Sequence, residues 1–345
     1  MTWVSGSLYA RRPMDFELSA DQEALRDAAR SLLTTRSDVA VVRATMDRGG
    51  EHDATLWSSM VDQGWCGIAV PDSLSGVGLG WVEAAVLLEQ VGAHVAPAPI
   101  LGQLVALEFL AATEWGAGLL DGSLIATVAP RLGEPTVYAP SSDVVLVADP
   151  ARVELVAIDL RGRRPAAEPA MDLTRTVGWL RADALGGAPR MVVGGAVDLA
   201  RFGDLAAVAY SAELLGIAQR SMEMSVEYAK QRVQFGQPIG SFQAIKHRCA
   251  DMLVDVEGMR SAVYWAAWCV SVGHEDASVA ASTAKCWCSD ACTRVLSSAL
   301  QVHGGIGFTW EHDLHLYLKR IHLDAVSFGD ARWHRDRLEA GLPVI

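Results

Sequence analysis

Residues 301–320 read QVHGGIGFTWEHDLHLYLKR, and this stretch does most to decide the fold. It places three glycines in four positions between two helical segments, where the backbone must turn sharply or lie close to a ligand. Two earlier stretches also combine a helix end with a turn: residues 232–236 read RVQFG, and residues 241–252 read SFQAIKHRCADM, with Ser241 placed as a helix N-cap. Each stretch by itself is typical of a helix end or an interhelical turn. Their order and spacing together are more informative.

Long amphipathic patterns surround these stretches. Residues 205–232, 242–270 and 277–304 repeat apolar side chains at helical spacing, which predicts an antiparallel helical bundle. Near the start of the chain, Ser19 followed by Gln22 predicts a capping box, and residues 14–120 read as an α-helical domain. Between the two helical regions, short β-branched runs are divided by Gly, Pro and Asp and predict a small β domain over residues 121–200.

Composition excludes several classes of protein. The 345 residues are 51% hydrophobic and 20% charged, as expected of a compact protein, and six sparse cysteines predict reduced thiols. The formal net charge of −12, without a Lys/Arg block, argues against a nucleic-acid partner. No apolar run is long enough to span a bilayer and the N-terminus lacks a signal pattern, so we expect a cytoplasmic protein without a membrane partner. Residues 1–13 show no periodicity and are expected to be a flexible extension.

The three quoted stretches together resemble the acyl-CoA dehydrogenase superfamily over residues 204–338, with weaker agreement over residues 14–112. The resemblance implies a mainly α protein with a small β domain: a helical N-terminal domain, a reduced central β domain, and a C-terminal four-helix bundle over residues 201–345 that carries the cofactor motifs. It also implies FAD as the cofactor. The expected assembly is a dimer or a tetramer, built from identical or different subunits.

The resemblance assigns FAD contacts residue by residue. In the family, the arginine, phenylalanine and glutamine of the first two stretches contact the pyrophosphate and adenosine, while the QxxGG loop of a neighbouring subunit closes over the same cofactor. The transfer is physically reasonable, because a guanidinium suits a diphosphate and glycine permits close backbone approach. The matching positions in this chain are Arg232, Phe235, Gln243, Gln301, Gly304 and Gly305.

The catalytic base departs from the family pattern. The family reaction is α,β-dehydrogenation of an acyl-CoA thioester, in which a glutamate removes the α-proton. Counting without a gap from Gln301 puts Phe328 at the usual glutamate position, and the alternative position on an earlier helix is Ala206. Nearby carboxylates could substitute, namely Asp204, Glu213 and above all Asp330. The alternative interpretation of Asp330 is an N-cap for the helix that starts at Ala331.

The middle of the chain also departs from the pattern, because it lacks the family's T-E-P-x-x-G-S-D loop; the nearest stretch, residues 133–136, reads GEPT. Short chains of this kind resemble the partner subunits of heterotetrameric acyl-CoA dehydrogenases of actinobacterial steroid-CoA degradation. The predicted function is FAD-dependent dehydrogenation of an acyl-CoA, with electrons passed to an electron-transfer flavoprotein, by this chain or by a heteromer that contains it. The alternatives are a catalytically silent, FAD-holding partner subunit and a nitroalkane oxidase-like or hydroxylating flavoenzyme on the same scaffold.

No metal is expected. His312, His315 and His322 lie in a segment that the resemblance already explains, and the spacing of Cys286, Cys288 and Cys292 fits core packing better than a zinc site.

Overall fold

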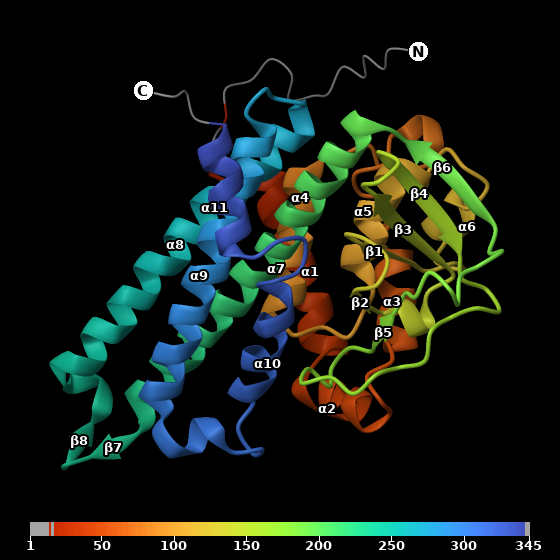
Figure 1. Ribbon diagram of the computed structural model, residues 1–345. Helices are drawn as coiled ribbons and strands as arrows, with labels where there is room; N and C mark the ends of the chain where they lie inside the picture. The colour runs from red at the N-terminus through yellow and green to blue at the C-terminus, as the bar shows by residue number, and fades with distance from the viewer. Residues whose placement is uncertain (1–13, 15–16, 342–345) are drawn as a thin grey trace.

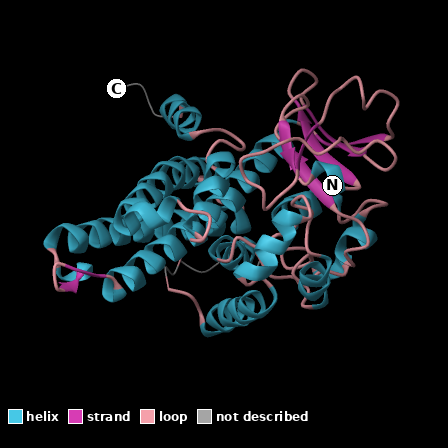
Figure 2. Cartoon of the chain, turned by 90° about the horizontal axis from the view of Figure 1, so that it is seen from below, coloured by secondary structure: helices cyan, strands magenta, loops and turns pink. Residues whose placement is uncertain are grey.

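The computed structural model describes Met14 and residues 17–341, and their fold has three regions. Figure 1 shows a sheet at one side of the molecule, a bundle of long helices at the other, and N-terminal helices between and behind them. Figure 2 shows the same arrangement from below, with the sheet at one corner of a largely helical chain. Among the described residues, no helix is both long and apolar enough to cross a membrane.

The N-terminal region is helical. The Ser19 hydroxyl accepts a hydrogen bond from the Gln22 backbone, and the Gln22 side-chain oxygen accepts one from the Ser19 backbone nitrogen, so the predicted capping box is confirmed. Asp38 and Asp53 cap the next two helices through their carboxylates. The helices are α1 (Ala20–Arg36), α2 (Val39–Asp47), α3 (Ala54–Asp62), α4 (Trp81–Ala93), α5 (Ile100–Leu110) and α6 (Gly116–Leu120).

The central region is a small mixed sheet. Its strand order is β1-β3-β4-β6, with β1 parallel to β3 and the other neighbours antiparallel; β2 and β5 form a separate ribbon. All four residues of β1 and the first four of β3 are buried, which fits their runs of Ala, Val and Leu. The strands are β1 (Ala126–Ala129), β2 (Pro135–Val137), β3 (Val144–Asp149), β4 (Glu154–Asp159), β5 (Val177–Trp179) and β6 (Arg190–Gly194).

The C-terminal region is built around one long helix, α7 (Ala196–Gln231), which packs on the N-terminal helices and on two bundle partners. A hairpin of β7 (Val233–Gln234) and β8 (Gln237–Pro238) turns the chain into α8. The remaining elements are α8 (Gln243–Val272), α9 (Ala277–His303), the 3-10 helix η4 (Gly304–Phe308), α10 (Leu314–Asp324) and α11 (Ala331–Ala340). The predicted architecture is confirmed, while the predicted domain boundaries stay predictions and residues 1–13 lie outside the described residues.

Helices α4 and α7 cross at two glycines. A Cβ atom on Gly216 of α7 would overlap the carbonyl oxygen of Glu89, and one on Gly92 of α4 would overlap the carbonyl oxygen of Glu213. Each glycine therefore lies directly against the backbone of the other helix. Such close approach fixes both the separation and the rotation of the two helices, because no larger side chain fits at either position.

We expect Gly216→Ala to lower the free energy of unfolding by about 1–3 kcal/mol, because the added methyl group must push two helices apart. Gly203→Ala is the matched control on the same helix, since a Cβ there would meet nothing within 4 Å. The control should be neutral or stabilising by up to about 1 kcal/mol through helix propensity. The measurement is the urea or thermal unfolding midpoint; equal midpoints for the two variants would contradict the close crossing.

Candidate functional site

The first predicted FAD residues lie on an exposed hairpin at the end of α7. Arg232 is the C-cap of α7, and Phe235 adopts a left-handed conformation (φ 52°) at the turn between β7 and β8. Phe235 is 91% exposed, and its ring makes an edge contact with the Phe242 ring, with 6.0 Å between ring centroids. A ring this open is available to stack on a bound molecule.

The other predicted FAD residues lie at the same end of the bundle. Gln243 begins α8 and Gln301 lies in the last turn of α9, and these antiparallel helices bring the two positions to one end of the bundle (Figure 1). The prediction that Ser241 caps α8 is wrong: Phe242 holds the N-cap position, and the Ser241 hydroxyl donates to the Pro238 carbonyl in a short 3-10 turn. Because the 3-10 turn comes directly before α8, the Ser241 hydroxyl bonds to the preceding Pro238 carbonyl and does not cap the helix.

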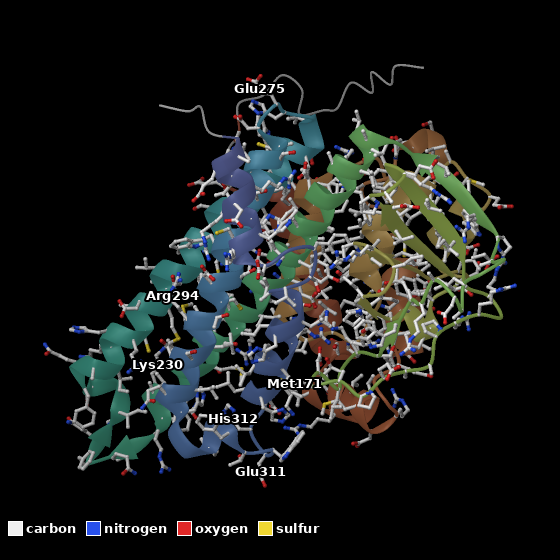
Figure 3. The ribbon with its side chains drawn as sticks, in the orientation of Figure 1. Met171, Lys230, Glu275, Arg294, Glu311 and His312 are labelled. Carbon is white, nitrogen blue, oxygen red and sulfur yellow. The ribbon has the colours of Figure 1, made fainter. Side chains whose placement is uncertain are left out.

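Helix α9 ends at the predicted glycine loop. Gly304 has φ 62°, and a Cβ atom on Gly304 or Gly305 would meet nothing within 4 Å. The backbone here is bare, as close approach of a ligand requires. We call this end of the bundle, with the β7–β8 hairpin, Gln243, Gln301 and the glycine loop, the bundle tip; Lys230, Glu311 and His312 in Figure 3 mark its surroundings.

The residues of the bundle tip fit part of an FAD molecule. In the described part of the chain, the exposed Arg232 forms no ion pair, so its guanidinium is available to a diphosphate. The open Phe235 ring can stack on an adenine, and the bare peptides near Gly304 can approach phosphate or ribose oxygens. These roles stay predictions, and they concern the nucleotide half of the cofactor.

The two positions at which the family keeps a base converge between the bundle and the sheet. The Phe328 ring lies 5.3 Å from the Phe202 ring and 5.9 Å from the Tyr210 ring, measured between centroids. Phe202 and Tyr210 flank Ala206 by one helical turn on either side, and all four side chains are buried. The gapless counts in the sequence thus lead to one place in the fold, which is an apolar cluster here. We call this place the junction.

The carboxylates that could replace a base have other partners. Asp330 is exposed, and its carboxylate caps α11 by accepting from the Trp333 backbone nitrogen at 2.7 Å. Asp204 is buried and bonded to Arg337 at 2.8 Å and Ser278 at 2.6 Å. Both carboxylates are structural in this geometry, and a catalytic role for Asp330 stays a prediction.

A buried charge network fills the junction beside the apolar cluster. Arg175 belongs to the strap, which we define as residues 161–176 between β4 and β5, and its guanidinium reaches Asp324 at 2.7 Å and Glu213 at 3.4 Å. Arg320 of α10 lies 3.2 Å from the same Glu213 carboxylate and 3.4 Å from Asp172 of the strap. All five side chains are buried. Sequence reasoning missed this network, because its members are far apart along the chain.

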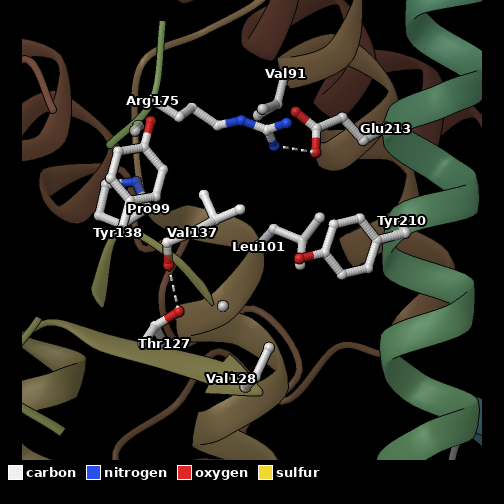
Figure 4. Close-up of a pocket in the computed structure, with 12 residues that line it drawn as sticks. Val91, Pro99, Leu101, Thr127, Val128, Val137, Tyr138, Arg175, Tyr210 and Glu213 are labelled. Atoms are coloured by element: carbon white, nitrogen blue, oxygen red, sulfur yellow. Dashed lines mark hydrogen bonds and ion pairs between the residues drawn. The ribbon is translucent and has the colours of Figure 1, made fainter. Parts of the chain in front are cut away.

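Little room remains at the junction. The cavity beside Arg175 has a volume of about 20 Å³ and is lined by Tyr138 and Val137 on one side, by Tyr210 and Glu213 on the other, and by Leu101 between them (Figure 4). That volume suits about one water molecule. A flavin ring or an acyl chain does not fit there in this conformation.

Lys285 holds the loop that carries Phe328. This buried amine donates to the carbonyl oxygens of Ala325 and Gly329, at 2.8 and 3.0 Å, and to the Ser289 hydroxyl at 3.2 Å. Phe328 and Gly329 both have positive φ, at 56° and 100°, so the loop is tightly turned. Burial lowers the pKa of Lys285 to about 8, because the charged form loses its hydration. A lysine within the Ala-rich helical stretch 277–304 was the available sequence signal.

Comparison with known proteins agrees with this geometry. Residues 200–342 match the family description "Acyl-CoA dehydrogenase, C-terminal domain", and residues 19–114 match "Acyl-CoA dehydrogenase, N-terminal domain". The acyl-CoA dehydrogenase IpdE2 of Mycolicibacterium smegmatis is 36% identical over 327 residues, covering 94% of this chain and 99% of that protein. The chain belongs to the acyl-CoA dehydrogenase family. It is therefore a flavoprotein oxidoreductase with FAD as cofactor, as the sequence predicted.

Other similar proteins match this chain over nearly its whole length. IpdE2 of Mycobacterium tuberculosis is 33% identical and covers 93% of this chain and 96% of its own length. Among solved structures, the ChsE4-ChsE5 complex from Mycobacterium tuberculosis contains a chain with TM-score 0.85 and 26% identity, covering 96% of this chain and all of that one. The Tcur3481-Tcur3483 steroid acyl-CoA dehydrogenase variant has TM-score 0.84 and 27% identity, covering 93% and 97%. Acyl-CoA dehydrogenases that assemble from two different chains thus share this fold.

The lowered pKa of Lys285 gives a pH test of the loop. Between pH 8 and 10.5 the unfolded chain keeps the Lys285 proton that the folded chain releases, so stability from this group rises with pH in that window. Lys285→Met should remove the rise. Between pH 7.5 and 9.5, we expect the unfolding midpoint of the wild type to rise relative to that of the variant. If the difference between the two midpoints does not change with pH, the Lys285 amine is hydrated in the folded chain.

Proposed function

We propose that this chain is one subunit of a heteromeric acyl-CoA dehydrogenase and that its bundle tip supplies FAD contacts to the active site of a base-bearing partner. The observation that carries the proposal is the contrast between two parts of one chain. The bundle tip is open and carries the six residues that the resemblance assigns to FAD, while the junction is filled and has Phe328 and Ala206 at the base positions.

The arrangement of the two parts supports an assembly. The bundle tip lies at the far end of the helices from the sheet (Figure 1), so the tip of a chain cannot reach its own junction. This separation supports the proposal that its FAD contacts serve a site on another chain. A junction with an open cavity and a glutamate would have to come from a partner that differs from this chain.

The chemistry divides accordingly. When bound, FAD accepts the hydride from the β-carbon of the acyl thioester. This chain would hold the diphosphate through Arg232 and stack on the adenine through Phe235, while the glycine loop that closes over the same cofactor would come from a neighbouring subunit. The partner would supply the carboxylate that removes the α-proton. A carboxylate there is needed, because losing a positioned base reduces the rate by about 10²- to 10⁴-fold.

The relatives support a proposal for the substrate class. We propose an acyl-CoA with a bulky, steroid-derived acyl group, since one similar structure is a steroid acyl-CoA dehydrogenase and another is a complex of two different chains. The proposed acceptor of the electrons is an electron-transfer flavoprotein, and the proposed compartment is the cytoplasm. The family membership favours this chemistry over nitroalkane oxidation or hydroxylation.

Arg232→Ala tests the role of the bundle tip in the co-expressed complex. The variant should assemble normally but lose most of its FAD on dialysis, because the diphosphate loses its guanidinium partner. The matched control is Arg131→Ala, an exposed arginine in the β region that pairs with Glu134. The measurement is flavin absorbance per mole of complex. Full flavin retention by Arg232→Ala would refute the assignment.

Asp330→Asn tests where the base lies. Asparagine caps a helix about as well as aspartate but cannot accept the α-proton, so the exchange separates the two roles. If the partner supplies the base, flavin bleaching by acyl-CoA should proceed at the wild-type rate in the assembled complex. A fall of about 10²-fold or more, with FAD still bound, would instead make Asp330 the base.

A further inference from the structure

At the inner end of the strap, residues 171–176, successive side chains face either solvent or the junction. The side chains of Met171 and Leu173 are 62% and 42% exposed, whereas Asp172, Thr174 and Arg175 point into the junction and are buried. Met171 is labelled in Figure 3 close to α10. Most of the strap before Met171 is also exposed. The strap is thus fastened to the helices at its inner end, chiefly through charged side chains.

We propose that the strap is a latch that closes the chain's own junction, that it exchanges between closed and open states, and that Asp324 takes up a proton when the latch closes. The inference concerns this chain alone, and it holds whether or not the bundle tip serves a partner.

The charges of the network favour such a proton. Three carboxylates, those of Asp172, Glu213 and Asp324, face the two guanidinium groups of Arg175 and Arg320. The fully buried Asp324 uses one oxygen for Arg175, while its Oδ2 has no hydrogen-bond partner within the described residues. A protonated carboxyl lowers the cost of this excess negative charge.

Burial raises the pKa of Asp324 to about 7 in the closed chain, and the neighbouring Glu213 carboxylate adds to the shift. The opposing influence comes from the cations, first of all Arg175. The ionisable groups that face Asp324 are Arg175 from the strap, Glu213 and Tyr210 from α7, Lys285 and Cys292 from α9, and Arg320 from α10.

Buried ion pairs that hold the strap to the helices can separate more readily than apolar contacts would. Charged groups regain hydration when they part, so a buried ion pair contributes little net stability compared with apolar packing. The anchor is also imperfectly satisfied, because the Tyr138 hydroxyl and the Thr176 hydroxyl are buried without hydrogen-bond partners in the described chain. Thr176 is the last residue of the strap, and the Tyr138 backbone nitrogen donates to its carbonyl. Opening would let water reach these groups, which partly offsets the lost contacts.

Linkage fixes the direction of the pH effect. In the open state Asp324 is hydrated and returns toward its ordinary value of 3.8, while the closed state holds the proton up to about pH 7. Lowering the pH therefore favours closure, and raising it favours opening. With one proton involved, the equilibrium constant for opening should rise about tenfold between pH 6 and pH 8.

The test is hydrogen exchange of the full chain between pH 6 and pH 8, corrected for the intrinsic pH dependence of amide exchange. Amides of residues 172–176 should lose about tenfold in protection over this range. Amides of β3 serve as the internal control, since they lie in the sheet away from the latch and should not share the slope. Asp324→Asn should fold with the latch closed and abolish the pH dependence at residues 172–176.

Two results would overturn the proposal. One is wild-type protection at residues 172–176 that does not change with pH relative to β3; this result needs no variant. The other is an Asp324→Asn chain that is folded, as judged by its unfolding midpoint, but keeps the wild-type slope. Flavin content plays no part in either readout, so failure here is separate from failure of the proposed subunit role.

Discussion

The direct contact between the backbones of α4 and α7 sets the position of the other described parts. Because Gly92 and Gly216 bring the helices together at the carbonyls of Glu213 and Glu89, the side chains of these two glutamates leave the crossing on different sides. Glu89 accepts from Arg260 and Tyr264 and so fastens α8. Glu213 meets Arg175 and Arg320 and so fastens the strap and α10. One contact thereby ties the N-terminal helices, the bundle and the sheet region together.

The sequence predicted what local chemistry determines. The Ser19 capping box and the order of helices, strands and helices were readable, because caps and apolar periods act over a few residues. The short helix α2 and the strands β2, β5 and β6 were missed, since elements of three to nine residues carry too little period to stand out. Ser241 shows that a residue typical of helix N-caps does not cap the helix when a 3-10 turn comes directly before it.

The site divides in the same way. The residues of the bundle tip were identified from motifs, and the structure places them at one end of the bundle. The filled junction was not predictable, because its charges at residues 172, 175, 213, 320 and 324 meet only after folding. The sequence alone makes Glu213 a candidate for a substitute base. Its two arginine partners come from segments 38 and 107 positions away.

The left-handed backbone at Phe328 has a consequence for how this chain could change. Together with Gly329 and the Lys285 clamp, it keeps the loop turned so that residue 328 points into the junction, although nothing in that side chain can accept a proton. Replacing Phe328 by glutamate would only bury an unpaired carboxylate among aromatic rings, at a cost of several kcal/mol. A working site would also require removal of Arg175 and new volume. A base at residue 328 is therefore difficult to create by single substitutions, and under the proposed subunit role a division of labour between unlike subunits would perpetuate itself.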